Sequence, residues 1–133
     1  MITTLFVFGD WALFALRVVL GAIMITHGWQ KAKGIKGTAG WLGSLGFKPA
    51  IMWAYIATYV ELLGGLCLVF GFLTQYASIL IALQFIVILL KIKKFQKFMG
   101  EGGYELDLLI LVGMLVLLTV GSGALSLDTT LFF

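Results

Sequence analysis

The chain has 133 residues, of which 62% are hydrophobic and 11% are charged, and its formal net charge is +3. Soluble globular domains are about 45–50% apolar and about 25% charged, so this composition excludes an ordinary water-soluble domain and a disordered chain. Because backbone polar groups in lipid must be satisfied internally, the sequence predicts an all-α membrane protein, with a single domain over residues 1–133.

A helix that spans a membrane needs about 20 mostly apolar residues, and four segments approach this length. In chain order they are 11–29, 50–73, 74–92 and 104–121, which predicts a bundle of four transmembrane helices. The connection after the first span contains the stretch AGWLGSLGF at residues 39–47. This stretch is either a short interfacial piece with Trp41 at the headgroup level or an apolar loop packed on the bundle.

Lysines divide the connections between the predicted spans into two kinds. All eight lysines lie beside or within the first and third connections, whereas the turn at residues 74–75 and both chain ends carry none. Because cytoplasmic loops are enriched in Lys and Arg, we expect both lysine-rich loops in the cytoplasm and the N- and C-termini extracytoplasmic. This orientation predicts a multi-pass protein of the cell (plasma or inner) membrane. The lysines are Lys31, Lys33, Lys36, Lys48, Lys91, Lys93, Lys94 and Lys97.

Two charged residues lie well inside the predicted spans, away from their ends. Arg17 lies about 10 Å inside the outer end of the first span, and Glu61 lies near the middle of the second. A charge at mid-span costs about 2.5–3.5 kcal/mol, so it usually faces the bundle interior and has a partner. We expect an ion pair or shared polar network between Arg17 and Glu61. The alternative is a structural pair that only locks the two helices together.

A second polar group is expected near the cytoplasmic boundary. His27 and Lys31 are four residues apart and share a helix face, and Glu105 and Asp107 begin the fourth span at the same boundary. Asp107 is about 200° around the helix from Glu105, so the two cannot both face one site directly. Glu105 falls in the more specific motif, Gly102-Gly103-Tyr104-Glu105-Leu106, and the catalytic candidates are therefore His27, Lys31 and Glu105. Asp107 and Gln84 are secondary polar residues. A snorkelling Lys31 and a hydrogen-bonded buried His27 are the structural alternatives.

The sequence also excludes several kinds of site. One cysteine, Cys67, and one histidine, His27, exclude an internal disulfide, an iron–sulfur cluster and bis-histidine haem within one chain. No glycine signature of a nucleotide site occurs in the required context, and no metal site is predicted. Because the basic residues adjoin hydrophobic spans, nucleic acid is not an expected partner.

Five short motifs together resemble the DoxX family of small four-span membrane proteins. The resemblance covers about residues 11–121. One departure is Gln75, where the family often has Arg. The motifs are Arg17-x3-Gly21, His27-Gly28-x2-Lys31, Glu61-Leu62-Leu63-Gly64-Gly65, Gly71-Phe72-Leu73-Thr74 and Gly102-Gly103-Tyr104-Glu105-Leu106.

The resemblance implies membrane oxidoreduction, of the kind carried out by subunits of quinone-reducing thiosulfate oxidation. The leading hypothesis is therefore a membrane subunit of a quinone-linked oxidoreductase system, of the thiosulfate, sulfur or thiol type, with quinone as the ligand. His27 would donate to a quinone oxygen, Lys31 would stabilise negative charge, and Glu105 or Glu61 would relay protons.

Two alternatives stay open at this stage. One is a non-catalytic membrane anchor or scaffold for redox partners, and the other is a small-solute carrier that uses Arg17 and Glu61. The expected partners are membrane lipid, other redox subunits and a second copy of the chain in a homodimer. Whether the chain is itself an enzyme is left open.

Overall fold

A computed structural model describes residues 8–44, 46–92, 105–123, 125–126 and 128 of the chain, and the side chains of 91 and 92 are outside this description. The described residues form helices and no strand. The prediction of an all-α protein is thus confirmed for this part of the chain. The helices are α1 (Gly9–Lys33), α2 (Ile35–Ser44), α3 (Ala50–Phe70), α4 (Thr74–Val87), the π-helix η2 (Ile88–Ile92) and α5 (Glu105–Val120).

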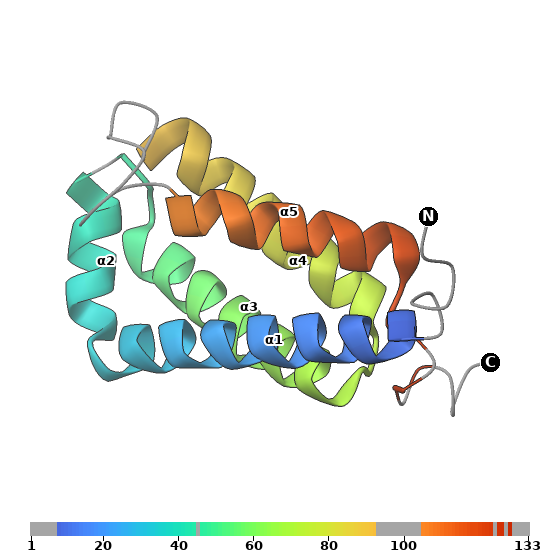
Figure 1. Ribbon diagram of the computed structural model, residues 1–133. Helices are drawn as coiled ribbons and strands as arrows, with labels where there is room; N and C mark the ends of the chain where they lie inside the picture. The colour runs from blue at the N-terminus through green and yellow to red at the C-terminus, as the bar shows by residue number, and fades with distance from the viewer. Residues whose placement is uncertain (1–7, 45, 93–104, 124, 127, 129–133) are drawn as a thin grey trace.

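Helices α1, α3, α4 and α5 lie side by side, and α2 lies across one end of this bundle (Figure 1). The predicted spans 50–73 and 104–121 correspond to α3 and α5, and the span 74–92 corresponds to α4 together with η2. Helix α1 is longer than predicted, and it extends beyond residue 29 to Lys33. Residues 93–104, with three of the predicted loop lysines, lie outside the described residues.

The segment at 39–47 is largely helical, as part of α2. Ala39 and Leu42 on its inner face are buried and pack near Ala54 of α3, whereas Trp41 is exposed. The segment therefore combines the two arrangements considered from the sequence, because one face packs on the bundle while the tryptophan points away from it.

The centre of the bundle is a continuous apolar cluster to which all four long helices contribute. The side chains on the outside of the bundle are also mostly apolar and exposed, which is the distribution expected where lipid replaces water. Helices α1 and α3 are long and apolar enough to cross a membrane. The buried cluster contains Leu20, Met24, Leu68, Ala77, Ile81, Ala82, Phe85, Ile110, Met114 and Leu117.

Glycines allow α1 and α3 to approach closely. A Cβ atom added to Gly21 would lie 2.7 Å from the carbonyl oxygen of Gly65, and one added to Gly28 would lie 3.0 Å from the backbone nitrogen of Leu62. Small residues at helix crossings permit this kind of backbone contact in membrane proteins. The contact fixes which residues of the two helices lie at the same level.

Candidate functional site

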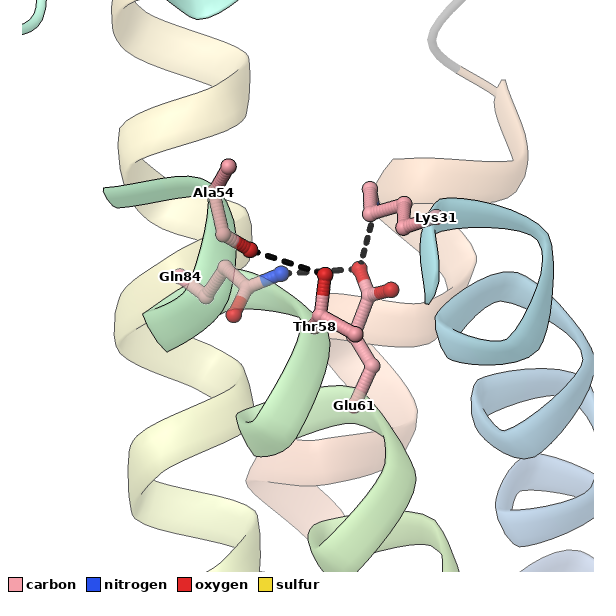
Figure 2. A network of polar contacts seen from close by, with 5 residues as sticks. All are labelled: Lys31, Ala54, Thr58, Glu61 and Gln84. Carbon is pink, nitrogen blue, oxygen red and sulfur yellow. Dashed lines mark hydrogen bonds and ion pairs between the residues drawn. The ribbon is translucent and has the colours of Figure 1, made fainter. Parts of the chain in front are cut away.

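Glu61 is the centre of a polar network that joins three helices (Figure 2). Its side chain is fully buried, at 0% exposure. Its Oε1 atom accepts a hydrogen bond from Lys31 Nζ at 2.5 Å and another from Gln84 Nε2 at 2.8 Å. Lys31 comes from α1 and Gln84 from α4. We call these three residues the Glu61 network.

The local sequence of α3 explains why Glu61 points inward. Its buried residues recur every three or four positions, so they form one stripe along the helix. The hydroxyl of Thr58, one turn before Glu61, donates a hydrogen bond to the carbonyl oxygen of Ala54 at 2.8 Å, so this buried polar group has a partner within α3. The stripe consists of Ala54, Thr58, Glu61, Gly65 and Leu68.

The contact between α1 and α3 explains why Lys31 is the partner. Gly21 of α1 lies against Val69 of α3, and Gly28, seven residues later in α1, lies against Leu62, seven residues earlier in α3. The two helices are therefore antiparallel. One further turn of α1 reaches Lys31, which then lies near the level of Glu61. A long lysine side chain spans the remaining offset.

An open pocket adjoins this network. It has a volume of about 240 Å³ and is lined by His27, Gln30, Lys31 and Thr38. The side chain of Lys31 is 24% exposed, whereas that of Glu61 is 0% exposed. Lys31 therefore connects the pocket to a carboxylate inside the bundle.

The second oxygen of Glu61 is buried as well. Within the described part of the chain, Glu61 Oε2 has no hydrogen-bond partner. Most buried polar side-chain atoms have at least one partner, and a carboxylate oxygen is a strong acceptor or, when protonated, a donor. The network is thus able to make one more hydrogen bond at this atom.

The predicted pairing of Arg17 with Glu61 is wrong. Arg17 is buried, at 1% exposure, but its Nη1 donates to the carbonyl oxygen of Ser122 and its Nη2 to that of Leu125, each at 2.8 Å. The guanidinium lies against Gly71 at the end of α3. Glu61 is ten residues earlier in that helix, which places it about 15 Å away along the axis.

Of the two acidic residues at the start of α5, the structure buries Asp107 and exposes Glu105. Asp107 is buried, at 7% exposure, and shares the inner stripe of α5 with Ile110. Glu105 is exposed and is not among the residues that line the pocket. Since the two acidic residues lie about 200° apart on the helix, burial of one turns the other outward.

The structure also places the other three predicted site residues, His27, Lys31 and Gln84. His27 and Lys31 lie together at the pocket, as their shared helix face predicts. Gln84 donates between helices, which matches its predicted secondary role, although its acceptor Glu61 was not anticipated. Sequence reasoning missed the Lys31–Glu61 pair, and the signal that could have found it is the register implied by the glycines of α1 and α3.

Known proteins similar to the chain point to one family. The DoxX family model matches residues 12–94. CatD of Bacillus subtilis (strain 168), whose name classes it provisionally as an oxidoreductase, is 38% identical over 117 residues, which are 88% of this chain and 84% of CatD. Inner membrane protein YqjF of Escherichia coli (strain K12) is 29% identical over 123 residues, 92% of this chain and 93% of YqjF. No solved structure matches significantly.

These matches and the geometry agree on the kind of protein. The chain is a helical membrane protein with an ion pair buried between its helices. It belongs to the DoxX family, so the resemblance carried by its motifs is confirmed. The matched region contains all three members of the Glu61 network.

Proposed function

We propose that the protein is a four-span membrane subunit of a quinone-linked oxidoreductase, with its lysine-rich end in the cytoplasm and both termini on the other side. The apolar outer faces of the helices support four spans. The tryptophans support helices that run across the bilayer, because tryptophan is enriched at both membrane interfaces. All four are exposed near helix ends: Trp11 at 61%, Trp29 at 57%, Trp41 at 47% and Trp53 at 40%.

The observation that carries the proposal is the link from an open pocket, through Lys31, to the buried carboxylate of Glu61. A quinone head group is a flat ring with two carbonyl oxygens, and it needs hydrogen-bond donors at its edge. His27, Gln30 and Lys31 each supply such a donor, whereas the hydroxyl of Thr38 donates to the carbonyl oxygen of Gly34. The pocket volume of about 240 Å³ suits a head group, since pockets for whole drug-sized ligands measure about 300–1,000 Å³.

Reduction of a quinone to a quinol takes up two electrons and two protons. In the proposed reaction the electrons come from a reduced sulfur compound or a thiol, directly or through a partner subunit. The ammonium group of Lys31 stabilises negative charge on a ring oxygen. Glu61 holds that ammonium in place, and Gln84 in turn donates to Glu61. His27 and Lys31 pass protons to the ring oxygens and regain them through the open side of the pocket.

The test is quinol formation by purified protein in lipid nanodiscs, with a short-chain quinone as acceptor and thiosulfate or a dithiol as donor. We expect His27→Ala and Lys31→Met to lower the rate at least tenfold, which corresponds to about 1.4 kcal/mol of transition-state stabilisation. Lys33→Met is the matched control, because Lys33 stacks on Trp29 and does not line the pocket. Unchanged rates in both pocket variants would overturn the assignment.

Equilibrium dialysis of the same quinone separates binding from turnover. Saturable quinone binding that is lost in Lys31→Met and kept in Lys33→Met supports the site. This result does not depend on turnover, so it holds even if the purified protein lacks the partner subunit that donates electrons. An anchor protein instead binds no quinone and co-purifies with redox subunits. A carrier instead gives solute uptake into proteoliposomes that Glu61→Gln abolishes, and the apolar cluster across the bundle centre argues against such a path.

A further inference from the structure

Lys31 is shared between the open pocket and the interior of the bundle. Its Nζ atom donates to Glu61 Oε1 at 2.5 Å, and its side chain also lines the pocket beside His27 and Gln30. A lysine ammonium group has three N–H donors, and the contact with Glu61 uses one of them. Lys31 is therefore able to bind a ligand in the pocket without releasing Glu61.

The charge of the ligand decides whether this arrangement stays balanced. Lys31 and Glu61 together are neutral, so an uncharged ligand leaves the balance as it is. A ligand with a negative charge on a ring oxygen instead places two anions beside one cation. Because Glu61 is 0% exposed, an uncompensated charge there is costly. An anionic ligand therefore favours the uptake of one proton, which restores neutrality.

The carboxyl group of Glu61 has an atom that can take up this proton. Figure 2 shows that the contacts from Lys31 and Gln84 both end at the same oxygen, Oε1. The other oxygen, Oε2, is buried and has no hydrogen-bond partner among the residues that the structure describes. Hydrogen bonds to a carboxylate favour its ionised form, and Oε2 receives none. A proton at Oε2 leaves the Glu61 network in place.

Two other titratable side chains compete with Glu61 for the proton. His27 lies at the pocket, and Asp107 is buried on the inner stripe of α5. The further titratable side chains described on α2, α3 and α4 are exposed, except for Cys67, which lies six residues beyond Glu61 in α3. The exposed ones are Lys36, Tyr55, Tyr59 and Tyr76.

We propose that the pocket binds an anionic ligand together with one proton, and that Glu61, acting through Lys31, holds this proton. The inference rests on the proposed function and specifies the charge of the preferred ligand, for example the anion of a hydroxyquinone. In the proposed reduction the same charge arises when electrons reach the ring. Glu61 then holds a proton until the ring oxygens have taken up two protons from the pocket, and releases it when the ligand is the neutral quinol. Glu61 is a positioning residue, since it contacts Lys31.

The test counts the protons taken up for each ligand bound. A hydroxynaphthoquinone that is ionised at neutral pH is compared with uncharged naphthoquinone, with protein in nanodiscs and a pH-indicator dye in weak buffer. We expect about one proton for each bound anion and none for the uncharged quinone. Because one proton is linked to binding, the affinity for the anion should rise about tenfold per pH unit as the pH falls. This slope applies where the ligand and the ligand-free Glu61 are both ionised.

Glu61→Gln removes the proton site and keeps an acceptor oxygen for Lys31. We expect it to abolish proton uptake and to bind the anion at least tenfold more tightly, because Lys31 then faces one anion instead of two. A merely structural role of Glu61 would weaken binding. Asp107→Asn is the matched control, another change of a buried acid to its amide, and His27→Gln tests the imidazole. Both should keep one proton for each bound anion.

Infrared difference spectroscopy of the wild type needs no variant to fold. Binding of the anion should produce the carbonyl band of a protonated carboxylic acid, and carbon-13 labelling of glutamate should shift this band. A shift with labelled aspartate instead, or proton uptake that persists in Glu61→Gln, would overturn the assignment. If both quinones bind without proton uptake, the inference fails and the proposed function stands. If neither quinone binds, the proposed function fails and the inference with it.

Discussion

The bundle buries an ion in two places, at Glu61 and at Arg17, and the two ions are neutralised in different ways. Glu61 is paired with side chains from two other helices, and one of them, Lys31, also lines an open pocket. Arg17 is bound by backbone carbonyls of the segment after α5. An apolar cluster containing Met24, Ile81 and Met114 occupies the bundle centre.

The kind of partner, side chain at Glu61 or backbone carbonyl at Arg17, decides what chemistry each region can carry out. A carboxylate and an ammonium can exchange protons with a ligand, and Lys31 is partly exposed where a ligand can reach it. Backbone carbonyls cannot change protonation, so the carbonyl contacts of Arg17 hold the segment after α5 against the bundle. We therefore assign the proposed redox chemistry to the Glu61 network and an anchoring role to Arg17.

Removal of Lys31 should have the largest effect on stability. Lys31→Met leaves the buried Glu61 with Gln84 as its partner, and loss of one member of a buried ion pair costs about 3–5 kcal/mol. Chemical denaturation in detergent micelles measures the loss. Lys33→Met is the control, and it should change stability by no more than about 0.5 kcal/mol. Equal losses in the two variants would show that Glu61 does not depend on Lys31.

Removal of Arg17 should cost less. Arg17→Met takes the donors away from the carbonyls of Ser122, which is buried, and of Leu125, which is exposed. One unsatisfied buried polar group costs about 1–3 kcal/mol. We also expect faster hydrogen exchange at Asp128, because the segment loses its attachment. A loss of stability without faster exchange at Asp128 would contradict the anchoring role.

Crowding the contact between α1 and α3 should disturb the region that connects the two sites. The Cβ atom of Gly21→Ala would meet the backbone oxygen of Gly65 at 2.7 Å, and overpacking costs about 1–3 kcal/mol. Gly37→Ala in α2 is the control, since nothing lies within 4 Å of its added Cβ, and it should gain up to about 1 kcal/mol. Thermal unfolding of both variants provides the comparison.

Removal of Gln84 should have the smallest effect of these changes. Gln84→Leu deletes one hydrogen bond to Glu61 and leaves the ion pair with Lys31, and hydrogen bonds to charged groups contribute about 1.5–3 kcal/mol. We expect a loss near the lower limit, measured by the same denaturation. A loss as large as that of Lys31→Met would mean that the amide, rather than the ammonium, holds the carboxylate.

The sequence predicted the helices well because their signal is local. Runs of apolar residues bounded by charges or glycines predicted segments that match α3, α5 and α4 with η2 within a few residues. The shared face of His27 and Lys31 follows from helix periodicity alone. Helix α2 was harder to predict, because its ten residues include three glycines, Gly37, Gly40 and Gly43, which disfavour helix. Its formation depends on packing against α3.

The pairing of charges could not be predicted in the same way, since it depends on how far one helix is shifted along another. Depth estimates placed Arg17 and Glu61 within reach, but the backbone contact of Gly21 with Gly65 sets a register in which Lys31 is the nearer cation. The partners of Arg17 could not be predicted from helix periodicity, because they lie in the non-helical segment after α5. The chain after α5 folds back over the end of α3 and meets the start of α4.

A double-mutant cycle on stability tests the central claim most directly. The cycle joins Lys31→Met with Glu61→Gln, and a second cycle joins Arg17→Met with Glu61→Gln. The structure predicts a coupling of about 2 kcal/mol for Lys31 with Glu61, and additivity within about 0.5 kcal/mol for Arg17 with Glu61. Strong coupling of Arg17 with Glu61 and additivity for Lys31 would contradict the account.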